Sequence, residues 1–324
     1  MKAIVYTQYG SPDVLQLKEV VKPEPKDDQV LIKVRAASAN ALDYRRFEKL
    51  SAMGRLMEEK MLKSVGKTFG ADIAGVVEAV GVNVKQFRLG DAVFGIAAGS
   101  KGGFAEYASA NEDHLTLKPA NLSFEAAAAV PVAALAALQG LRDKGQLQPG
   151  QKVLIVGASG GVGTFAVQIS KAFGAEVTAV CSARNLDMAR SIGADNVIDY
   201  AKEDFTKSNQ GYDLILAVNG NYPLSAYRRA LSPQGSYVCA GGAMSQILQA
   251  MLLGSLISRK SGKKMGFMGI AKYSQKDLVY LKELLESGKV APVIEKSLPL
   301  CEVPVGMCYL AEGHAKGKIV FQIS

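Results

Sequence analysis

The sequence predicts an α/β fold in which a β-rich unit is followed by a doubly wound parallel sheet. The first third of the chain is a series of short apolar runs separated by turns rich in Gly and Pro. From residue 152 onward, short apolar runs alternate with helical stretches, as in a parallel sheet covered by helices. The length of 324 residues suits two domains. We expect one domain from residues 1–120 and 271–324, and a second from residues 121–270.

The strongest single motif lies at residues 152–174. Residues 153–156 form a wholly apolar run suited to a buried strand, glycines follow at once, and apolar residues then recur at helical spacing up to Gly174. A strand, a glycine turn and a helix N-terminus together form a site for a dinucleotide pyrophosphate, although a structural turn alone could carry the same glycines. Against G-x-G-x-x-G the chain has Ala158, Gly160 and Gly163, so alanine replaces the first glycine. The residues expected to bind the cofactor here are Ser159, Gly160, Gly161, Val162 and Gly163.

Further apolar runs predict the rest of the parallel sheet. They lie at residues 176–180, 196–198, 213–217, 235–240 and 264–270. Asn219 follows the run at 213–217 and Gly241-Gly242 follows the run at 235–240, which are the fourth and fifth strands of the sheet when residues 153–156 are counted as the first. We expect these residues to lie near the nicotinamide ribose, because ligands bind at the carboxyl ends of such strands. The glycines are equally consistent with plain turns.

The residues after the second strand predict which dinucleotide binds. An NAD site places Asp or Glu there, whereas this chain has Ser182 and Arg184. A hydroxyl and a guanidinium suit a 2′-phosphate, since arginine presents a planar fork of donors to phosphate oxygens. Asp187 is placed in the following helix, on a solvated face. The sequence therefore predicts NADPH rather than NADH.

Elements outside the cofactor unit follow from periodicity and turn residues. Strands are expected at residues 2–6, 15–20, 30–34, 70–81, 90–95 and 104–107, with helix and loop at 40–67. Ser123 is expected to cap a helix that runs to residue 129, and Pro131 to begin the next one. A helix at 274–287 precedes strands at 290–293, 298–300 and 318–323, which should rejoin the N-terminal unit.

Composition narrows the classes of partner. There is no signal peptide and no apolar run long enough to span a bilayer, so a cytoplasmic protein without membrane attachment is expected. The four cysteines are scattered, as buried reduced thiols would be. The net charge of +8 could serve a nucleic acid, a membrane or an anionic ligand. Nucleic acid is disfavoured, because glutamates interrupt the basic stretch at 45–67 and no aromatic ladder accompanies it.

Several motifs occur in an order that resembles one family, over essentially the whole chain. They are Gly75-x-Val77 through Gly81, Gly90-Asp91-x-Val93-x-Gly95, Gly103-Phe-Ala-Glu106-Tyr107, Ala127-Ala-Ala-Val130-Pro131, Gly157 to Gly163 and Gly317-Lys318-Ile-Val320. The chain resembles the medium-chain dehydrogenase/reductase superfamily, and within it the zinc-free quinone oxidoreductase (zeta-crystallin-like) branch. The resemblance implies a GroES-like β-rich catalytic domain and a Rossmann cofactor domain, with the active site in the cleft between them. It also places Tyr200, Phe267 and Lys318 near the cofactor.

The same resemblance bears on zinc. Where zinc alcohol dehydrogenases carry Cys, Gly-His-Glu and a later Cys, this chain has Asn40, Gly70-Ala71-Asp72 and residues 130–134. These positions offer no thiolate or imidazole for a three-ligand catalytic zinc. His114 and His314 have no ligand partners at useful spacing. No metal is expected, and simple alcohol oxidation is disfavoured without a Lewis acid.

The resemblance further implies that NADPH reduces a small quinone or an enone (α,β-unsaturated carbonyl) by hydride transfer. Asn40 takes the place of the lost cysteine and could hydrogen-bond the nicotinamide or the substrate carbonyl. Asp43, Tyr44 and Arg45 are further catalytic candidates, and the alternative for them is local helix capping and surface pairing. Protonation can come from water. Members of the family commonly dimerise through the cofactor domain, so a homodimer is also considered.

Two other functions stay open. One is an NADPH-linked reductase of saturated carbonyls, resembling an alcohol dehydrogenase. The other is a scaffold of low turnover that binds NADPH or RNA, for which the basic stretches are the motivation.

Overall fold

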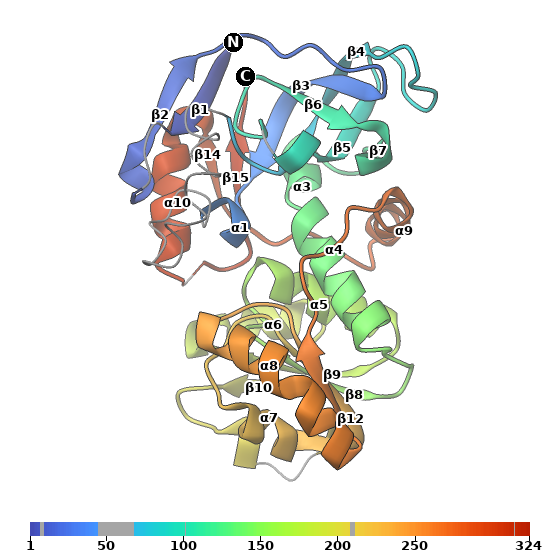
Figure 1. Cartoon of the computed structure of the whole chain (residues 1–324), viewed down its shortest axis with the longest axis vertical. Coiled ribbons are helices and arrows are strands. Elements are labelled where there is room, and N and C mark those ends of the chain that lie inside the picture. Colours follow the sequence, from blue (N-terminus) through green and yellow to red (C-terminus); the bar gives the residue numbers. More distant parts are fainter. Residues whose placement is uncertain (7–9, 45–67, 101, 208–210, 314) are drawn as a thin grey trace. The chain divides into compact units, whose positions relative to one another are not determined.

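The computed structural model describes residues 1–6, 10–44, 68–100, 102–207, 211–313 and 315–324 (Figure 1). These residues form two compact units. Unit 1 contains Met1–Val132, Tyr273–Glu286 and Ile294–Ser324, and unit 2 contains Ala133–Lys272 and Ser287–Val293. This division falls twelve residues after the boundary expected at 120, and the predicted domain boundaries stay a prediction.

Unit 1 is built on a seven-stranded sheet in the order β14-β15-β3-β4-β5-β7, with β6 also paired to β3. The strands are β3 (Gln29–Ser38), β4 (Asp72–Val80), β5 (Ala92–Ile96), β6 (Tyr107–Asn111), β7 (Leu115–Leu117), β14 (Ile294–Pro299) and β15 (Lys318–Gln322). β1 (Lys2–Tyr6) and β2 (Leu15–Glu19) form a separate antiparallel pair. The C-terminal strand β15 runs antiparallel to β3, with Val320 opposite Ser38. The prediction that the C-terminus rejoins the N-terminal unit is therefore confirmed.

Two strands predicted for the β-rich domain are wrong in position. Residues 290–293 are not a strand, and the ladder begins only at Ile294. Pro292 explains this difference, since it has no N–H to donate to a ladder. The strand expected at 104–107 begins instead at Tyr107, and Ala105 makes one isolated bridge, to Ala3.

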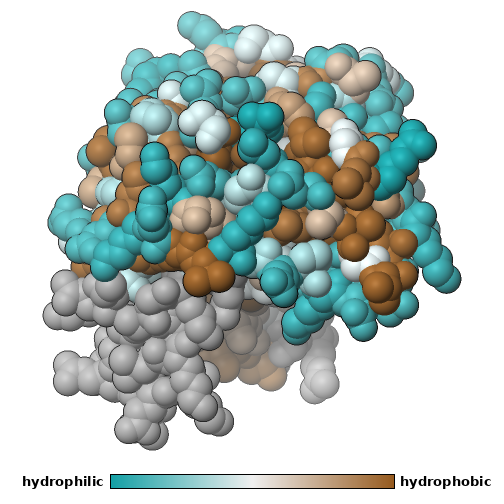
Figure 2. Space-filling model, turned by 90° about the horizontal axis from the view of Figure 1, so that it is seen from above, coloured by the Kyte–Doolittle hydropathy of each residue, from teal (hydrophilic) through white to brown (hydrophobic). Residues whose placement is uncertain are grey.

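The core of unit 1 is aromatic at its centre. The Phe104 ring meets Phe69 edge to face at 5.0 Å between centroids and Phe321 at 5.3 Å, which joins three distant parts of the chain. The helices are α1 (Ala41–Tyr44), α3 (Phe124–Ala128), α9 (Gln275–Glu286) and α10 (Val303–Ala311). Ser123 caps α3 as predicted, because its Oγ accepts from the Ala126 N–H at 3.2 Å. Figure 2 shows one face of the molecule, on which hydrophilic and hydrophobic residues are interspersed.

Unit 2 is a six-stranded parallel sheet in the order β10-β9-β8-β11-β12-β13. Its strands are β8 (Lys152–Val156), β9 (Glu176–Cys181), β10 (Asn196–Asp199), β11 (Tyr212–Ala217), β12 (Leu231–Cys239) and β13 (Lys264–Phe267). All six strands were expected from the sequence. The strand order reverses direction between β8 and β11, and sheets of this kind bind ligands at the carboxyl ends of the strands at such a point.

Helices connect and cover these strands. They are α4 (Pro131–Gln139, continued by a π-helical turn at Gly140–Lys144), α5 (Gly161–Ala172), α6 (Leu186–Ser191), α7 (Leu224–Ala230) and α8 (Met244–Ser261). α5 and α6 pack on β9, whereas α7 and α8 pack on β12 (Figure 1). α8 leaves several apolar side chains exposed, among them Met251, Leu252 and Leu256. Within the described ranges, no helix combines the length and the apolar composition that crossing a membrane requires.

Candidate functional site

The glycine turn between β8 and α5 leads from a buried strand directly into a helix N-terminus. Gly157 adopts a φ of +85°, a conformation that favours glycine, and the N–H groups of Gly157 and Ala158 both donate to the Val180 carbonyl at 3.1 Å. Gly157 therefore makes the tight turn. When the sequence is matched to G-x-G-x-x-G, the first glycine of the motif falls on position 158, which is alanine. In the structure, Gly157, one residue earlier, makes the turn expected of that first glycine.

The other two glycines of the motif have different roles. A Cβ added at Gly163 would lie 2.1 Å from the Gly157 carbonyl oxygen, so this glycine allows helix α5 to pack against the turn. A Cβ added at Gly160 would meet only the Gly157 oxygen, at 3.7 Å. Gly160 is the N-cap of α5, where backbone N–H groups are available to an anion. The turn at Gly160 is thus open enough for a phosphate group to approach.

Three turns at the carboxyl ends of β8, β11 and β12 lie against one another. A Cβ at Gly157 would lie 2.8 Å from the Asn219 nitrogen, and one at Gly242 would lie 3.0 Å from the Gly220 oxygen. The predicted residues Asn219, Gly241 and Gly242 are therefore gathered around the same end of the sheet as Gly160. Their contact with a cofactor stays a prediction.

Two buried residues that sequence reasoning missed support these turns. Gln246 accepts a hydrogen bond from the Tyr227 hydroxyl at 3.1 Å and donates to the Gly241 carbonyl at 3.4 Å. Burial raises the pKa of Tyr227 far above its usual range, so the hydroxyl stays a donor. No sequence motif marked either residue, because both are ordinary helix residues by pattern.

The residues expected to select NADPH lie together after β9. Ser182 follows the strand directly and its Oγ accepts from the Asn185 side chain at 3.2 Å, while Arg184 is exposed two residues later. Because Asp199 of β10 lies opposite Cys181, Tyr200 comes beside Ser182 at the end of the sheet. Asp187 is fully exposed and pairs with Arg190 at 2.9 Å, as expected of a solvated helix face.

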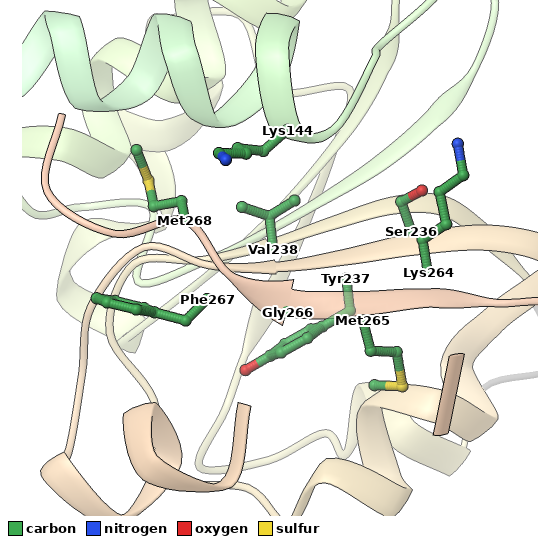
Figure 3. Close-up of a pocket in the computed structure, with 9 residues that line it drawn as sticks. All are labelled: Lys144, Ser236, Tyr237, Val238, Lys264, Met265, Gly266, Phe267 and Met268. Atoms are coloured by element: carbon green, nitrogen blue, oxygen red, sulfur yellow. The ribbon is translucent and has the colours of Figure 1, made fainter. Parts of the chain in front are cut away.

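Phe267 lies apart from this group, in a shallow depression of roughly 330 Å³ along β12 and β13. Figure 3 shows Lys144 and Val238 on one side of β13, with Met265 and Phe267 on the other. Phe267 alone among the predicted cofactor residues lines this depression. The depression is therefore distinct from the turns around Gly160, and the role of Phe267 stays a prediction.

Unit 1 contains a buried polar cluster around Asn40. The Asn40 side chain donates from Nδ2 to Asp72 Oδ2 at 2.9 Å, and its Oδ1 accepts from Lys318 Nζ at 2.7 Å. Asp72 also accepts from the Ser38 hydroxyl at 2.7 Å and from the Val132 N–H at 2.9 Å. Asn40 is 8% exposed, and Asp72 is completely buried.

The other three catalytic candidates, Asp43, Tyr44 and Arg45, follow Asn40 in the chain. Asp43 is buried and accepts from the Asn40 backbone N–H at 2.9 Å, which is the helix-capping role considered as its alternative. Tyr44 is half-buried against the core of unit 1. Arg45 lies outside the described residues. A catalytic role for these three residues stays a prediction.

Lys318 occupies an unexpected place in the same cluster. Its ammonium group is 3% exposed and donates to the Ala39 carbonyl at 3.0 Å, to Asn40 Oδ1 at 2.7 Å and to Asp72 Oδ2 at 3.1 Å. All three N–H donors of an ammonium group are thereby used. A contact from Lys318 to the dinucleotide would have to replace one of these bonds, and that contact stays a prediction.

The described residues include no group of three or more His, Cys, Asp or Glu placed to hold a metal ion. His114 packs against the Tyr273 ring at 5.2 Å, and His314 lies outside the described residues. The four cysteines are free thiols, of which Cys181 and Cys239 are buried. Cys301 and Cys308 are exposed, so the expectation of four buried thiols is wrong for these two.

Fold and site together define a two-unit protein in which a dinucleotide-type parallel sheet accompanies a β-rich unit with a buried polar cluster. Two family models match the chain: the alcohol dehydrogenase GroES-like domain at residues 26–120 and the zinc-binding dehydrogenase at residues 192–321. The chain belongs to the medium-chain dehydrogenase/reductase superfamily, and its homologues and structural neighbours are quinone oxidoreductase-like.

Curated relatives and solved structures agree with this assignment. The chain is 37% identical to the 2-methylene-furan-3-one reductase of Solanum lycopersicum, over 99% of this chain and 78% of the relative. It is 34% identical to the chloroplastic NADPH-dependent alkenal/one oxidoreductase of Arabidopsis thaliana, over 99% of this chain and 79% of the relative. The structure of the quinone oxidoreductase from Coxiella burnetii is 30% identical, with a TM-score of 0.87 and coverage of 100% of this chain and 99% of that one.

Proposed function

We propose that the protein is an NADPH-dependent oxidoreductase that transfers a hydride to a quinone or an α,β-unsaturated carbonyl without using a metal. The observation that carries the proposal is the open glycine turn at the N-terminus of α5, with Ser182 and Arg184 after the adjacent strand. The relatives named for reduction of an alkenal or of a methylene-furanone support the substrate class, since both names describe a carbon–carbon double bond conjugated to a carbonyl.

The residues present fit a phosphorylated dinucleotide. The turn from Ser159 to Gly163 would hold the pyrophosphate on the N-terminus of α5. Ser182, Arg184 and Tyr200 would hold the 2′-phosphate, because a hydroxyl and a guanidinium are donors and the position lacks the acidic residue that prefers NADH. When bound, NADPH supplies the hydride.

Asn40 is our candidate for the group that meets the substrate or nicotinamide carbonyl. Reduction of an enone adds a hydride to the β-carbon and develops negative charge on the carbonyl oxygen, so an N–H donor near that oxygen lowers the barrier. A proton from water then completes the saturated ketone, and in the same way a quinone becomes a hydroquinone. Because water supplies the proton, the reaction needs no side chain of the protein as a general acid.

Metal independence is part of the proposal. The stretches that match the zinc ligands of related alcohol dehydrogenases are Asn40, Gly70-Ala71-Asp72, where alanine stands in the place of the histidine, and residues 130–134. Asp72 of the second stretch accepts hydrogen bonds from Asn40, from the Val132 N–H and from Lys318. An amide, one carboxylate and backbone groups form a poor ligand set for catalytic zinc. The matching family model is described as a zinc-binding dehydrogenase, but the residues at these positions do not suit a catalytic zinc ion.

A panel of acceptors tests the substrate class. Purified protein treated with a chelator is mixed with NADPH and 1,4-benzoquinone, 9,10-phenanthrenequinone, an alkenal or a saturated aldehyde, and loss of NADPH absorbance is followed. We expect turnover with the quinones or the alkenal and none with the saturated aldehyde. Turnover of the saturated aldehyde would favour the carbonyl reductase alternative. A complete lack of turnover, together with salt-sensitive RNA binding, would favour the scaffold.

We further propose a cytoplasmic homodimer. β13 ends the parallel sheet and, among the described residues, pairs only with β12, while apolar side chains of α8 beside it are exposed. An open strand edge flanked by apolar surface suits pairing with a second copy. Light scattering at micromolar concentration should give twice the chain mass of 34.3 kDa, and a monomer at all concentrations would refute the dimer.

A further inference from the structure

The three stretches that match the zinc ligands of metal-containing relatives converge on one carboxylate. Asn40 donates to Asp72 Oδ2 at 2.9 Å, and the Val132 N–H donates to Asp72 Oδ1 at 2.9 Å. These residues come from the end of β3, the start of β4 and the start of α4. The three stretches therefore meet at one buried carboxylate, although they lack the thiolate and imidazole ligands of a zinc site.

A cation does occupy the centre of this arrangement, and it is an ammonium group. Lys318 enters from β15, which lies beside β3, and its Nζ lies 3.1 Å from Asp72 Oδ2 with both side chains buried. Its three donors match three oxygen acceptors from Ala39, Asn40 and Asp72. A divalent metal at this place would meet the positive charge of the ammonium group at short range, and the nearest oxygens already accept hydrogen bonds from Lys318.

The ammonium group also determines how the Asn40 amide is oriented. Its Oδ1 faces the Lys318 donor and its Nδ2 faces the Asp72 acceptor. A flipped amide would place an NH₂ group against an ammonium group and an oxygen against a carboxylate, which is doubly unfavourable. The second Nδ2 hydrogen has no acceptor among the described residues, so it is available to a ligand carbonyl.

We propose that Lys318 is a resident cation that replaces the metal of related enzymes and acts as a positioning residue, holding the Asn40 amide with one N–H directed to the reacting carbonyl. The positioning role rests on the proposed function, because it requires that Asn40 contacts the carbonyl of the substrate or of the nicotinamide. The occupation of the cation position by Lys318 is independent of that function and can be tested without turnover.

Kinetics of Lys318→Met test the positioning role. The variant keeps a side chain of similar length but loses the charge and the donors, so the Asn40 amide is no longer held. We expect kcat to fall on the order of 10- to 100-fold, because a small misplacement of a catalytic group has effects of this size. The KM for NADPH should change by less than about twofold, because all three Lys318 donors are used within unit 1. A larger rise would instead support a contact from Lys318 to the dinucleotide. Lys316→Met removes the same charge two residues away and serves as the matched control.

The double variant Lys318→Met/Asp72→Asn separates positioning from folding. Loss of the lysine alone leaves a buried carboxylate without its counter-charge, which could unfold unit 1. The double variant removes both charges and should regain thermal stability, but kcat should stay low because nothing orients Asn40. A kcat within twofold of the wild type in either folded variant would overturn the positioning role.

Nitrogen-15 NMR of the cofactor-free protein tests the resident cation separately. A buried ammonium group with three acceptors exchanges slowly, so we expect a Lys318 Nζ signal at neutral pH that disappears in Lys318→Met. Cobalt(II) added to the wild type should give no spectrum of a protein-bound metal. A missing ammonium signal, or stoichiometric cobalt binding at Asp72, would overturn the proposal whatever the enzyme turns over. A clear signal in a protein without any turnover would refute only the proposed function.

Discussion

Arg184 is the residue on which the choice of NADPH over NADH depends most. It is exposed, and it follows the end of β9 where an acidic side chain would accept from ribose hydroxyls instead. In Arg184→Glu we expect the KM for NADPH to rise roughly tenfold to a hundredfold, as loss of a charge-assisted phosphate contact predicts. The KM for NADH should change much less, because NADH has no 2′-phosphate.

Arg190→Glu is the control for this charge reversal. Arg190 lies on the neighbouring helix α6, is exposed and pairs only at the surface, with Asp187. Steady-state kinetics with both dinucleotides should be close to wild type in this variant. Equal effects of Arg184→Glu on NADPH and NADH would contradict our assignment of the phosphate site.

The four cysteines should differ in reactivity according to burial. Burial, with a smaller effect of the Asp199 charge, raises the pKa of Cys181 to about 11, and burial also raises the pKa of Cys239. Only roughly one Cys181 thiol in several thousand is then ionised at pH 7.5. We expect iodoacetamide to label Cys301 and Cys308 in the native protein, because both are exposed, and to label Cys181 and Cys239 only after unfolding.

Peptide mass spectrometry before and after addition of denaturant would check this order. Raising the pH toward the pKa of Cys181 should increase its labelling only if solvent reaches the thiol. Fast labelling of Cys181 in the native protein at pH 7.5 would mean that the end of β9 opens, which would conflict with the arrangement of the phosphate site.

At the scale of single residues, the sequence allowed positions to be predicted better than contacts. The place of Ser182 and Arg184 after β9 could be predicted because they follow a recognisable strand, and their contact with a phosphate stays a prediction. The contact between Lys318 and Asp72 could not, since 246 positions separate the two residues and no local pattern links them. Tyr227 and Gln246 were missed for the same reason, because tertiary packing alone brings them under the Gly241 turn.

The strand, turn and helix formed by β8, the glycines and α5 give a matched pair of variants. Gly160 has an extended backbone, with φ −79° and ψ 174°, and a Cβ there meets nothing closer than 3.7 Å. Gly160→Val should therefore fold while raising the Kd for NADPH at least about tenfold, because the side chain occupies the place of the pyrophosphate. Fluorescence titration would measure this, and unchanged affinity would contradict the site.

Gly163→Ala should show the opposite behaviour. Its Cβ would lie 2.1 Å from the Gly157 oxygen, so the helix must shift away from the turn. We expect the free energy of unfolding to fall by about 1–3 kcal/mol, as for other overpacked sites. Denaturant titration of both glycine variants would show whether stability and binding separate in this way.

At the scale of elements, the parallel sheet was fully predictable and the β-rich unit was not. Buried parallel strands appear as continuous apolar runs between helices, which is why β8 to β13 could all be identified. The strands of unit 1 are interrupted by bends, and Pro292 lies just before β14, so the ladder at Ile294 begins later than the apolar pattern suggested. α10 was missed because Pro304 lies in its first turn and its composition is apolar throughout.

For the whole molecule, a strongly anionic cofactor would account for the net charge of +8, and the expectation that no nucleic acid binds stays a prediction. The prediction of two domains rested on length and on the change of pattern near residue 121, and the two compact units agree with their number. The catalytic candidates belong to unit 1 and the dinucleotide candidates, apart from Lys318, to unit 2. The proposed function therefore draws on candidate residues from both units, which lie far apart in the sequence.

Transfer of deuterium from NADPH tests the central claim most directly. Chelator-treated protein, with its zinc content measured, is given NADPH deuterated at C4 and an enone, and the product is analysed by NMR. We predict one deuterium on the β-carbon of the saturated ketone, and full activity without zinc. Deuterium on the carbonyl carbon, or product formed only after zinc is added, would contradict the account.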